Sequence, residues 1–199
     1  MSDDATRSWL LIAVATGGSS TLRVHCWRKL RSLGALYIQS SVCLLPQTPE
    51  TTRAVARLLD RVRREGGTGR MLQITINDPA EEASILNQFR AERADEYQEV
   101  CSRTPEFLKE IETERARGRA TYTEVEESEA DLERLKKWLG RVQTRDYFGA
   151  SGRNEAELAV EACARALAEF EAEALASELP IEQIDENTAQ KLRRLHAVD

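Results

Sequence analysis

The feature that most constrains the fold is an uninterrupted apolar segment near the N-terminus, Trp9–Ala15. It has the length of a strand and is far too short to span a bilayer. Because polar residues do not alternate through it, it is typical of a central strand that is covered on its face. Two glycines end the segment, and the hydroxyl of Ser19 or Ser20 can cap a helix that runs over Leu22–Leu33.

The next segments complete a small α/β head. Ala35–Ile38 and Ser41–Leu45 have strand patterns, and the short distance between them predicts a hairpin. Thr48 caps a second helix, with Pro49 at the first helical position, where proline is tolerated. After a glycine pair, Arg70–Ile76 alternates as a last strand. The order β-α-β-β-α-β predicts a ferredoxin-like head within an α+β fold, with two helices on one side of an antiparallel sheet.

Beyond residue 76 the pattern is almost purely helical. Asp78 and Pro79 begin a long helix, which Pro105 either kinks or divides. A second helix contains Leu132–Val142, and a third covers about 154–177. The expected parts of the chain are the ferredoxin-like head at 1–76, a three-helix arm packed on it at 77–178, and a loosely attached tail at 179–199.

Charge divides the chain at the same place. Residues 1–76 hold 11 Lys and Arg against 5 Asp and Glu, whereas the remainder holds 17 against 29. A basic head and an acidic arm either face different partners or attract each other. The basic side chains of the two head helices form a candidate phosphate-binding surface, although a solvated or arm-paired face is the favoured alternative. They are Arg23, Arg28, Lys29, Arg31, Arg53, Arg57, Arg61 and Arg64.

An unusual segment interrupts the helical arm. Arg145, Asp146, Tyr147 and Phe148 place an ion-pairing group, a short acid and two aromatic rings at a helix-breaking point before Gly149. Either these four side chains line a ligand pocket, or the aromatic rings form a plug that holds the arm against the head. The plug is the preferred interpretation.

No residue constellation identifies a reaction. The four cysteines form no C-x-x-C pair, and with two histidines beside them no zinc-ligand spacing is present. The glycine-serine loop before the first helix matches neither nucleotide-binding spacing. We therefore expect no catalytic residue, no metal and no cofactor. The acidic N-terminus has no basic segment before its apolar run, so we also expect no secretory signal, no membrane partner and a cytoplasmic location with reduced cysteines.

Several ordered segments carry a family resemblance over about residues 8–175. They are Trp9–Ile12, Ser20–Val24, Trp27–Leu30, Leu33–Ala35, Val42–Pro46 and Trp138–Gly149. Together they resemble the N-terminal domain of ChrB-type chromate resistance proteins. The resemblance implies a role in regulating chromate export operons. The family has a second, C-terminal domain, so we expect a stand-alone form that lacks it.

The head also resembles the Cas2-like module of PaaX-type repressors, through Trp27–Leu30, the following Leu33-Gly34 and the strand before Pro46. Cas2 nucleases carry an acid at the end of the first strand. This chain has Ala13–Thr16 there, which offers no carboxylate to hold Mg²⁺. Nuclease chemistry is therefore not expected.

Three functions stay open at this stage. The leading hypothesis is a non-enzymatic, ChrB-like regulatory or stress-response protein that binds duplex DNA with its basic head. The second is a protein interaction module that forms homodimers or docks a partner through the acidic arm. The third is an oxyanion-binding protein, or an enzyme, with a pocket between head and arm.

Overall fold

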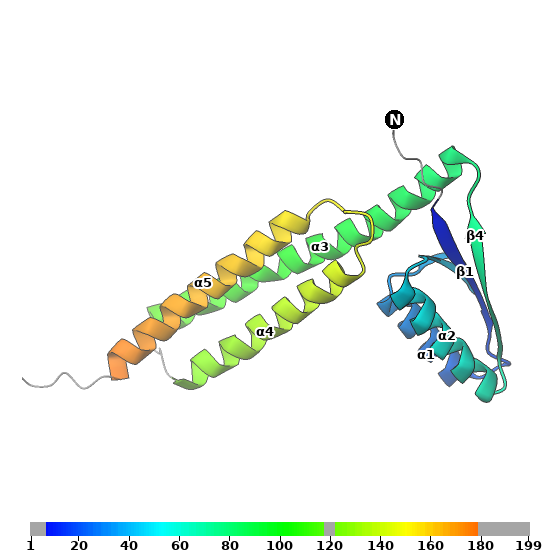
Figure 1. Ribbon diagram of the computed structural model, residues 1–199. Coiled ribbons are helices and arrows are strands. Elements are labelled where there is room, and N and C mark those ends of the chain that lie inside the picture. Colours follow the sequence, from blue (N-terminus) through cyan, green and yellow to red (C-terminus); the bar gives the residue numbers. More distant parts are fainter. Residues whose placement is uncertain (1–6, 118–121, 179–199) are drawn as a thin grey trace, which may run out of the picture. The chain divides into compact units, whose positions relative to one another are not determined.

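The computed structural model describes residues 7–117 and 122–178 (Figure 1). The chain divides into two compact units. Of the described residues, the first unit contains 7–104 together with Arg134–Val160, and the second contains 105–117, 122–133 and 161–178. The first unit thus includes the expected head and two stretches of the expected arm. The tail expected at 179–199 lies outside the described residues.

An antiparallel sheet forms the centre of the first unit. In the described part of the chain its four strands have the order β2-β3-β1-β4. They are β1 (Ser8–Ala15), β2 (Leu36–Gln39), β3 (Val42–Pro46) and β4 (Thr68–Thr75). The apolar run is a central strand, as predicted, because β1 pairs with β3 along one side and with β4 along the other. β2 and β3 form the predicted hairpin, and β2 and β4 are the edges of the sheet.

Two helices cover one face of this sheet. α1 (Ser20–Ser32) is capped by Ser19, whose hydroxyl accepts the N–H of Leu22 at 3.2 Å. α2 (Pro49–Arg64) is capped by Thr48, as the sequence predicts, in a reciprocal capping box with Thr51. The core between these helices and the sheet contains Leu10, Ile12, Cys43 and Leu45 from the strands, Leu22, Cys26 and Leu30 from α1, and Val55, Leu58, Leu59 and Val62 from α2.

A third helix covers part of the opposite face; the sequence predicted an arm packed on the head but not the face of the sheet that it covers. α3 (Pro79–Ala116) begins after Asp78, whose carboxylate accepts the N–H of Ala80 at 2.9 Å. Its first turns bring Phe89 onto Trp9, with ring centroids 5.7 Å apart. Since successive residues of a strand point to opposite faces, Trp9 lies in this second core while its neighbour Leu10 lies in the first.

The rest of the described chain is helical. α3 continues through Pro105 as one helix, which settles the choice between one helix and two. α4 (Tyr122–Thr144) and α5 (Arg153–Glu178) are the second and third helices that the sequence predicts. In the second unit, Arg115 of α3 forms ion pairs with Glu169 and Glu173 of α5, at 3.4 and 2.6 Å. Among the described residues, no helix combines the length and the hydropathy that crossing a membrane requires.

Candidate functional site

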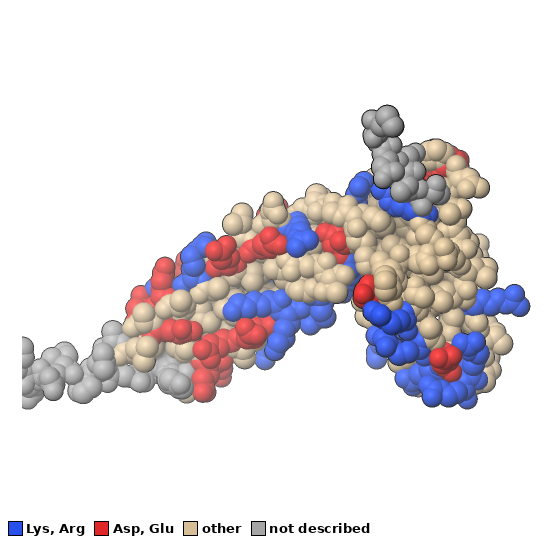
Figure 2. Space-filling view, viewed as in Figure 1, with Lys and Arg blue, Asp and Glu red and all other residues tan. Residues whose placement is uncertain are grey.

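The basic residues of the two head helices, α1 and α2, are here called the basic face. Figure 2 shows Lys and Arg gathered over α1 and α2. The helices are in contact there, because Nη1 of Arg61 lies 3.1 and 3.3 Å from the two ring nitrogens of His25. Seven of the eight predicted residues are exposed, and Arg61 is half-buried. The structure therefore brings the two helices that carry this set into contact.

Only some of these cations have carboxylate partners in the described residues. Arg53 pairs with Glu50 at 3.3 Å, and Arg61 pairs with Glu65 at 2.6 Å. Glu50 lies in α2 and Glu65 is its C-cap, and every side chain of the two pairs is at least 39% exposed, so each pair contributes little to stability. Arg57 forms no ion pair within the described part of the chain. The same holds there for Arg23, Arg28, Lys29, Arg31 and Arg64.

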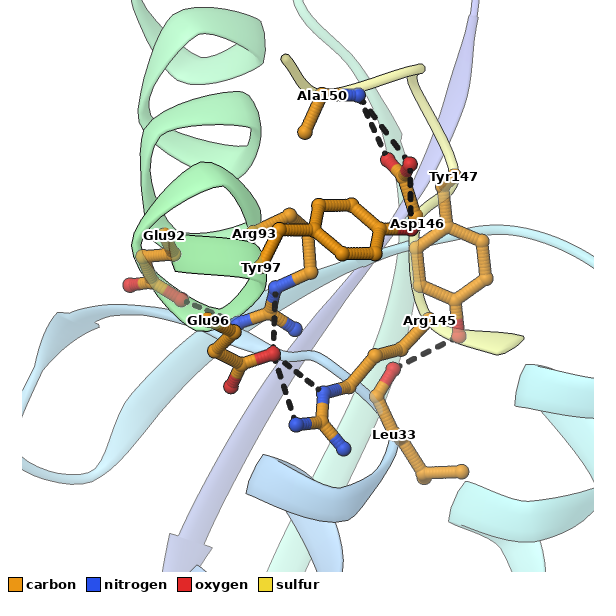
Figure 3. A network of polar contacts seen from close by, with 9 residues as sticks. All are labelled: Leu33, Glu92, Arg93, Glu96, Tyr97, Arg145, Asp146, Tyr147 and Ala150. Atoms are coloured by element: carbon orange, nitrogen blue, oxygen red, sulfur yellow. Dashed lines mark hydrogen bonds and ion pairs between the residues drawn. The ribbon is translucent and has the colours of Figure 1, made fainter. Parts of the chain in front are cut away.

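The second predicted set forms a connection, residues 145–150, which we call the clasp. Its residues join α4 to α5 and lie against the sheet and the first part of α3 (Figure 3). The hydroxyl of Tyr147 donates to the carbonyl oxygen of Leu33 at 2.7 Å. The ring of Phe148 packs on Trp9 and Phe89, with centroids 5.6 and 5.2 Å away. The clasp thus completes the core on the α3 side of the sheet.

A buried arginine beneath the clasp is surrounded by charged residues that are themselves partly or largely exposed. Arg93 of α3 is only 5% exposed, and its guanidinium lies 3.3 Å from Glu96 and 3.2 Å from Glu92. Glu96 also binds Arg145 of the clasp, at 2.8 and 3.0 Å. Burial lowers the pKa of Arg93 and raises that of Glu92, because each charged form loses water. Two arginines therefore depend on the carboxylate of Glu96.

A glycine makes room for this cluster. Gly34 has φ +75°, a conformation that other residues rarely adopt. A Cβ at Gly34 would lie 2.9 Å from Cβ of Arg145 and 3.1 Å from Nη1 of Arg93. Gly34 therefore has two roles, because it ends α1 and admits the clasp.

All four predicted clasp residues have partners within the protein. Asp146 accepts the hydroxyl of Tyr97 at 3.2 Å and the N–H of Ala150 at 3.0 Å, and Arg145, Tyr147 and Phe148 are engaged as described. These contacts support the plug interpretation. A ligand pocket formed by the four residues stays a prediction.

Two cavities lie beside α1, and sequence reasoning missed both. One, of about 490 Å³, is lined by Arg23, Trp27, Tyr37 and neighbouring residues of α1 and the β2–β3 hairpin. The other, of about 270 Å³, shares Trp27 and Tyr37 and is lined further by Arg93 and by acids of α3. A tryptophan outside the apolar stripe of α1 was the available signal, since Trp27 is 46% exposed.

The cysteines are placed as small apolar residues. Cys26, Cys43 and Cys163 are buried, and Cys101 is partly so. Burial raises the pKa of the Cys43 thiol to about 12, which disfavours the reactive thiolate. In the part of the chain that the structure describes, no three His, Cys, Asp or Glu residues are grouped so that they could hold a metal ion.

These features define an α+β protein with a sheet covered on both faces and a basic two-helix surface. The chain matches the family described as "Protein ChrB, N-terminal" over residues 23–180, and it belongs to that family. It is similar to Protein ChrB of Cupriavidus metallidurans, with 28% identity over 156 residues. The match covers 76% of this chain but 44% of that relative, so the chain spans less than half of its length. The family expected from the sequence is confirmed.

Proposed function

We propose that this chain is a non-enzymatic regulatory protein of the ChrB family, linked to chromate resistance, that binds duplex DNA through its basic face. Family membership supports the link to chromate resistance. A ferredoxin-like head, with the element order β-α-β-β-α-β and both α1 and α2 on one face, is part of the proposal. Such a head presents the outer sides of both helices to a partner.

The observation that carries DNA binding is the exposure of unpaired cations on two helices in contact. Arg57 and Arg64 of α2, and Arg28 and Lys29 of α1, form no ion pair within the described residues. Cations that neutralise phosphates release condensed counterions, which supplies most of the affinity for DNA irrespective of sequence. Arginine adds paired N–H donors that match phosphate oxygens. The basic face has both properties.

The test is fluorescence anisotropy with a labelled duplex, measured over a series of salt concentrations. The logarithm of the affinity should fall linearly with the logarithm of salt concentration. A double substitution, Arg57→Gln with Arg64→Gln, should weaken binding and reduce the salt slope by about one for each phosphate contact that is lost.

The control removes the same charge elsewhere. Arg153 and Arg165 are exposed on α5 and pair with Glu157 and Glu161. The double substitution Arg153→Gln with Arg165→Gln should leave the affinity within about twofold of the original, because neither residue belongs to the basic face. If the duplex does not bind at low salt, or if both double variants bind alike, the basic face is not the DNA site.

A second candidate function is association of two copies. Within the described ranges, β4 is an edge strand that pairs with β1 only, so the backbone groups on its other side can pair with a strand of a second copy. Leu72 of β4 is 50% exposed, which adds an apolar contact. Light scattering after size exclusion would test this, and a Leu72→Lys variant should shift a dimer toward monomer.

A further inference from the structure

The larger cavity beside α1 has the composition of a small-molecule site. Its volume, about 490 Å³, lies within the range typical of ligand pockets. Val14, Val24, Cys26 and Leu30 provide apolar walls, and the rings of Trp27 and Tyr37 lie among them. Polar side chains complete the lining, and such groups fix the orientation of a ligand in sites of this kind.

Among the described residues that line this cavity, Arg23 is the one cation. Arg23 lines it, and the guanidinium forms no ion pair within the described residues. The four other polar residues that line it, Thr16, Tyr37, Ser40 and Ser41, carry neutral hydroxyls. Among the residues that the structure describes, no carboxylate lines the cavity, so its field favours an anion.

The cavity also explains an otherwise unfavourable exposure. Val24 and Trp27 are 45% and 46% exposed, although α1 already buries a separate stripe in the core. Both side chains border the cavity, where an apolar ligand would remove them from water. Arg31 lines the second cavity, and its guanidinium carbon lies 5.3 Å from the centroid of the Trp27 ring that the two cavities share. The Arg31 cation is attracted by the quadrupole of the Trp27 ring, which holds the ring in place.

We propose that this cavity binds a small organic acid with a planar aromatic body. The carboxylate pairs with Arg23, and the ring system lies beside Trp27 and Tyr37. The second cavity would not suit such an anion, because Glu92, Asp95, Glu96 and Glu99 line it. The cavity shares Arg23 with the basic face, but it includes neither Arg57 nor Arg64, so the variants that test DNA binding leave the cavity unchanged.

Calorimetric titration of the full chain with 2-naphthoate tests the proposal. We expect saturable binding, weakened at least about tenfold by Arg23→Gln, because a hydrogen bond to a charged group is lost. The neutral amide, 2-naphthamide, should bind the unaltered chain about tenfold more weakly than 2-naphthoate does, because it carries no charge to pair with Arg23. Trp27→Ala should weaken naphthoate binding by a similar factor. Both substituted residues are exposed, so the variants should fold, which circular dichroism would verify.

Matched controls place the same changes outside the cavity. Arg70→Gln removes an exposed arginine from β4, and Leu72→Ala removes an exposed apolar side chain beside it. Both should leave naphthoate affinity within about twofold. The proposal is overturned if naphthoate does not bind at millimolar concentration, or if Arg23→Gln binds it as tightly as the unaltered chain. Equal affinity for octanoate would overturn the aromatic part of the proposal.

Discussion

The hydroxyl of Tyr147 donates a 2.7 Å hydrogen bond to the carbonyl oxygen of Leu33, a residue 114 positions earlier in the sequence. Leu33 is the C-cap of α1, where backbone carbonyls lack partners within the helix. A side chain from the connection between α4 and α5 therefore completes the end of a helix in the head. This bond, with the Phe148 contacts, makes the clasp a structural part of the first unit.

Replacing Tyr147 by Phe should lower the free energy of unfolding by about 1–2 kcal/mol, because the Leu33 carbonyl loses its donor while the ring remains. Urea denaturation measures the change. Thr144→Ala is the control, since the exposed Thr144 hydroxyl donates only within its own helix, to the carbonyl of Gly140. It should cost less than about 0.5 kcal/mol. Equal losses in the two variants would contradict a role for the Tyr147 hydroxyl.

Substitution of Gly34 by Ala should be costly for two reasons. The positive φ alone costs about 1 kcal/mol, and the new methyl group would lie 2.9 Å from Cβ of Arg145. We expect a total of about 3 kcal/mol, once the cost of displacing packed neighbours is included. Gly66 has φ +80° with no atom within 4 Å of the position of a Cβ, so Gly66→Ala isolates the backbone contribution. Equal losses of stability in the two variants, measured by thermal or urea unfolding, would contradict a close approach of Arg145 to the backbone of Gly34.

Glu96→Gln should destabilise the first unit by about 3 kcal/mol, because it leaves the charge of Arg93 buried without adequate compensation. The control is Glu65→Gln, which breaks an exposed pair with Arg61 and should cost less than about 1 kcal/mol. Arg145→Gln should lower the free energy of unfolding less in the Glu96→Gln background than in the unaltered chain, because the ion pair between Glu96 and Arg145 is already broken there. Additive losses in this double-mutant cycle would show that the two residues are not coupled.

Alkaline pH should weaken the fold through its buried phenols. Burial raises the pKa of Tyr37 and Tyr97 to about 12, and the Asp146 carboxylate adds to the effect at Tyr97. Unfolded tyrosine ionises near pH 10. Between those values the unfolded state binds fewer protons than the folded state, so stability must fall as pH rises.

The measurement is the free energy of unfolding as a function of pH from about 9 to 12, with tyrosine ionisation followed by absorbance. Each of the two tyrosines contributes at most about 1.4 kcal/mol per pH unit. Tyr97→Phe should reduce the slope, whatever it does to stability at neutral pH. Parallel profiles for Tyr97→Phe and the unaltered chain would contradict the assignment.

Local signals in the sequence were sufficient for the elements of the head. Thr48 with Pro49, and Asp78 with Pro79, mark two helix starts where the structure has them. These features are readable because capping depends on residues within one turn. The basic residues of α1 and α2 were likewise placed on exposed surfaces from their spacing alone.

The contacts between distant segments could not be predicted in the same way. Arg93 has the appearance of a surface residue, yet it is buried beneath the clasp. A signal was present, since Phe89, Arg93 and Tyr97 follow one another at four-residue spacing on the buried side of α3. To infer from this spacing that Arg93 is buried, one must know that Glu96 and Arg145 come together, and local sequence patterns do not show that. The cavities beside α1 depend in the same way on how a helix and a hairpin meet.

The clasp also bears on how the chain is made. Ribosomes release the N-terminal strand first, but Tyr147 and Phe148 emerge only after α3 and α4 have been synthesised. Until then Trp9 lacks one of its two aromatic neighbours, and the carbonyl of Leu33 has no phenol to bind. The sheet therefore acquires its last contacts late, and a nascent chain that has not yet reached Phe148 carries an unfinished core.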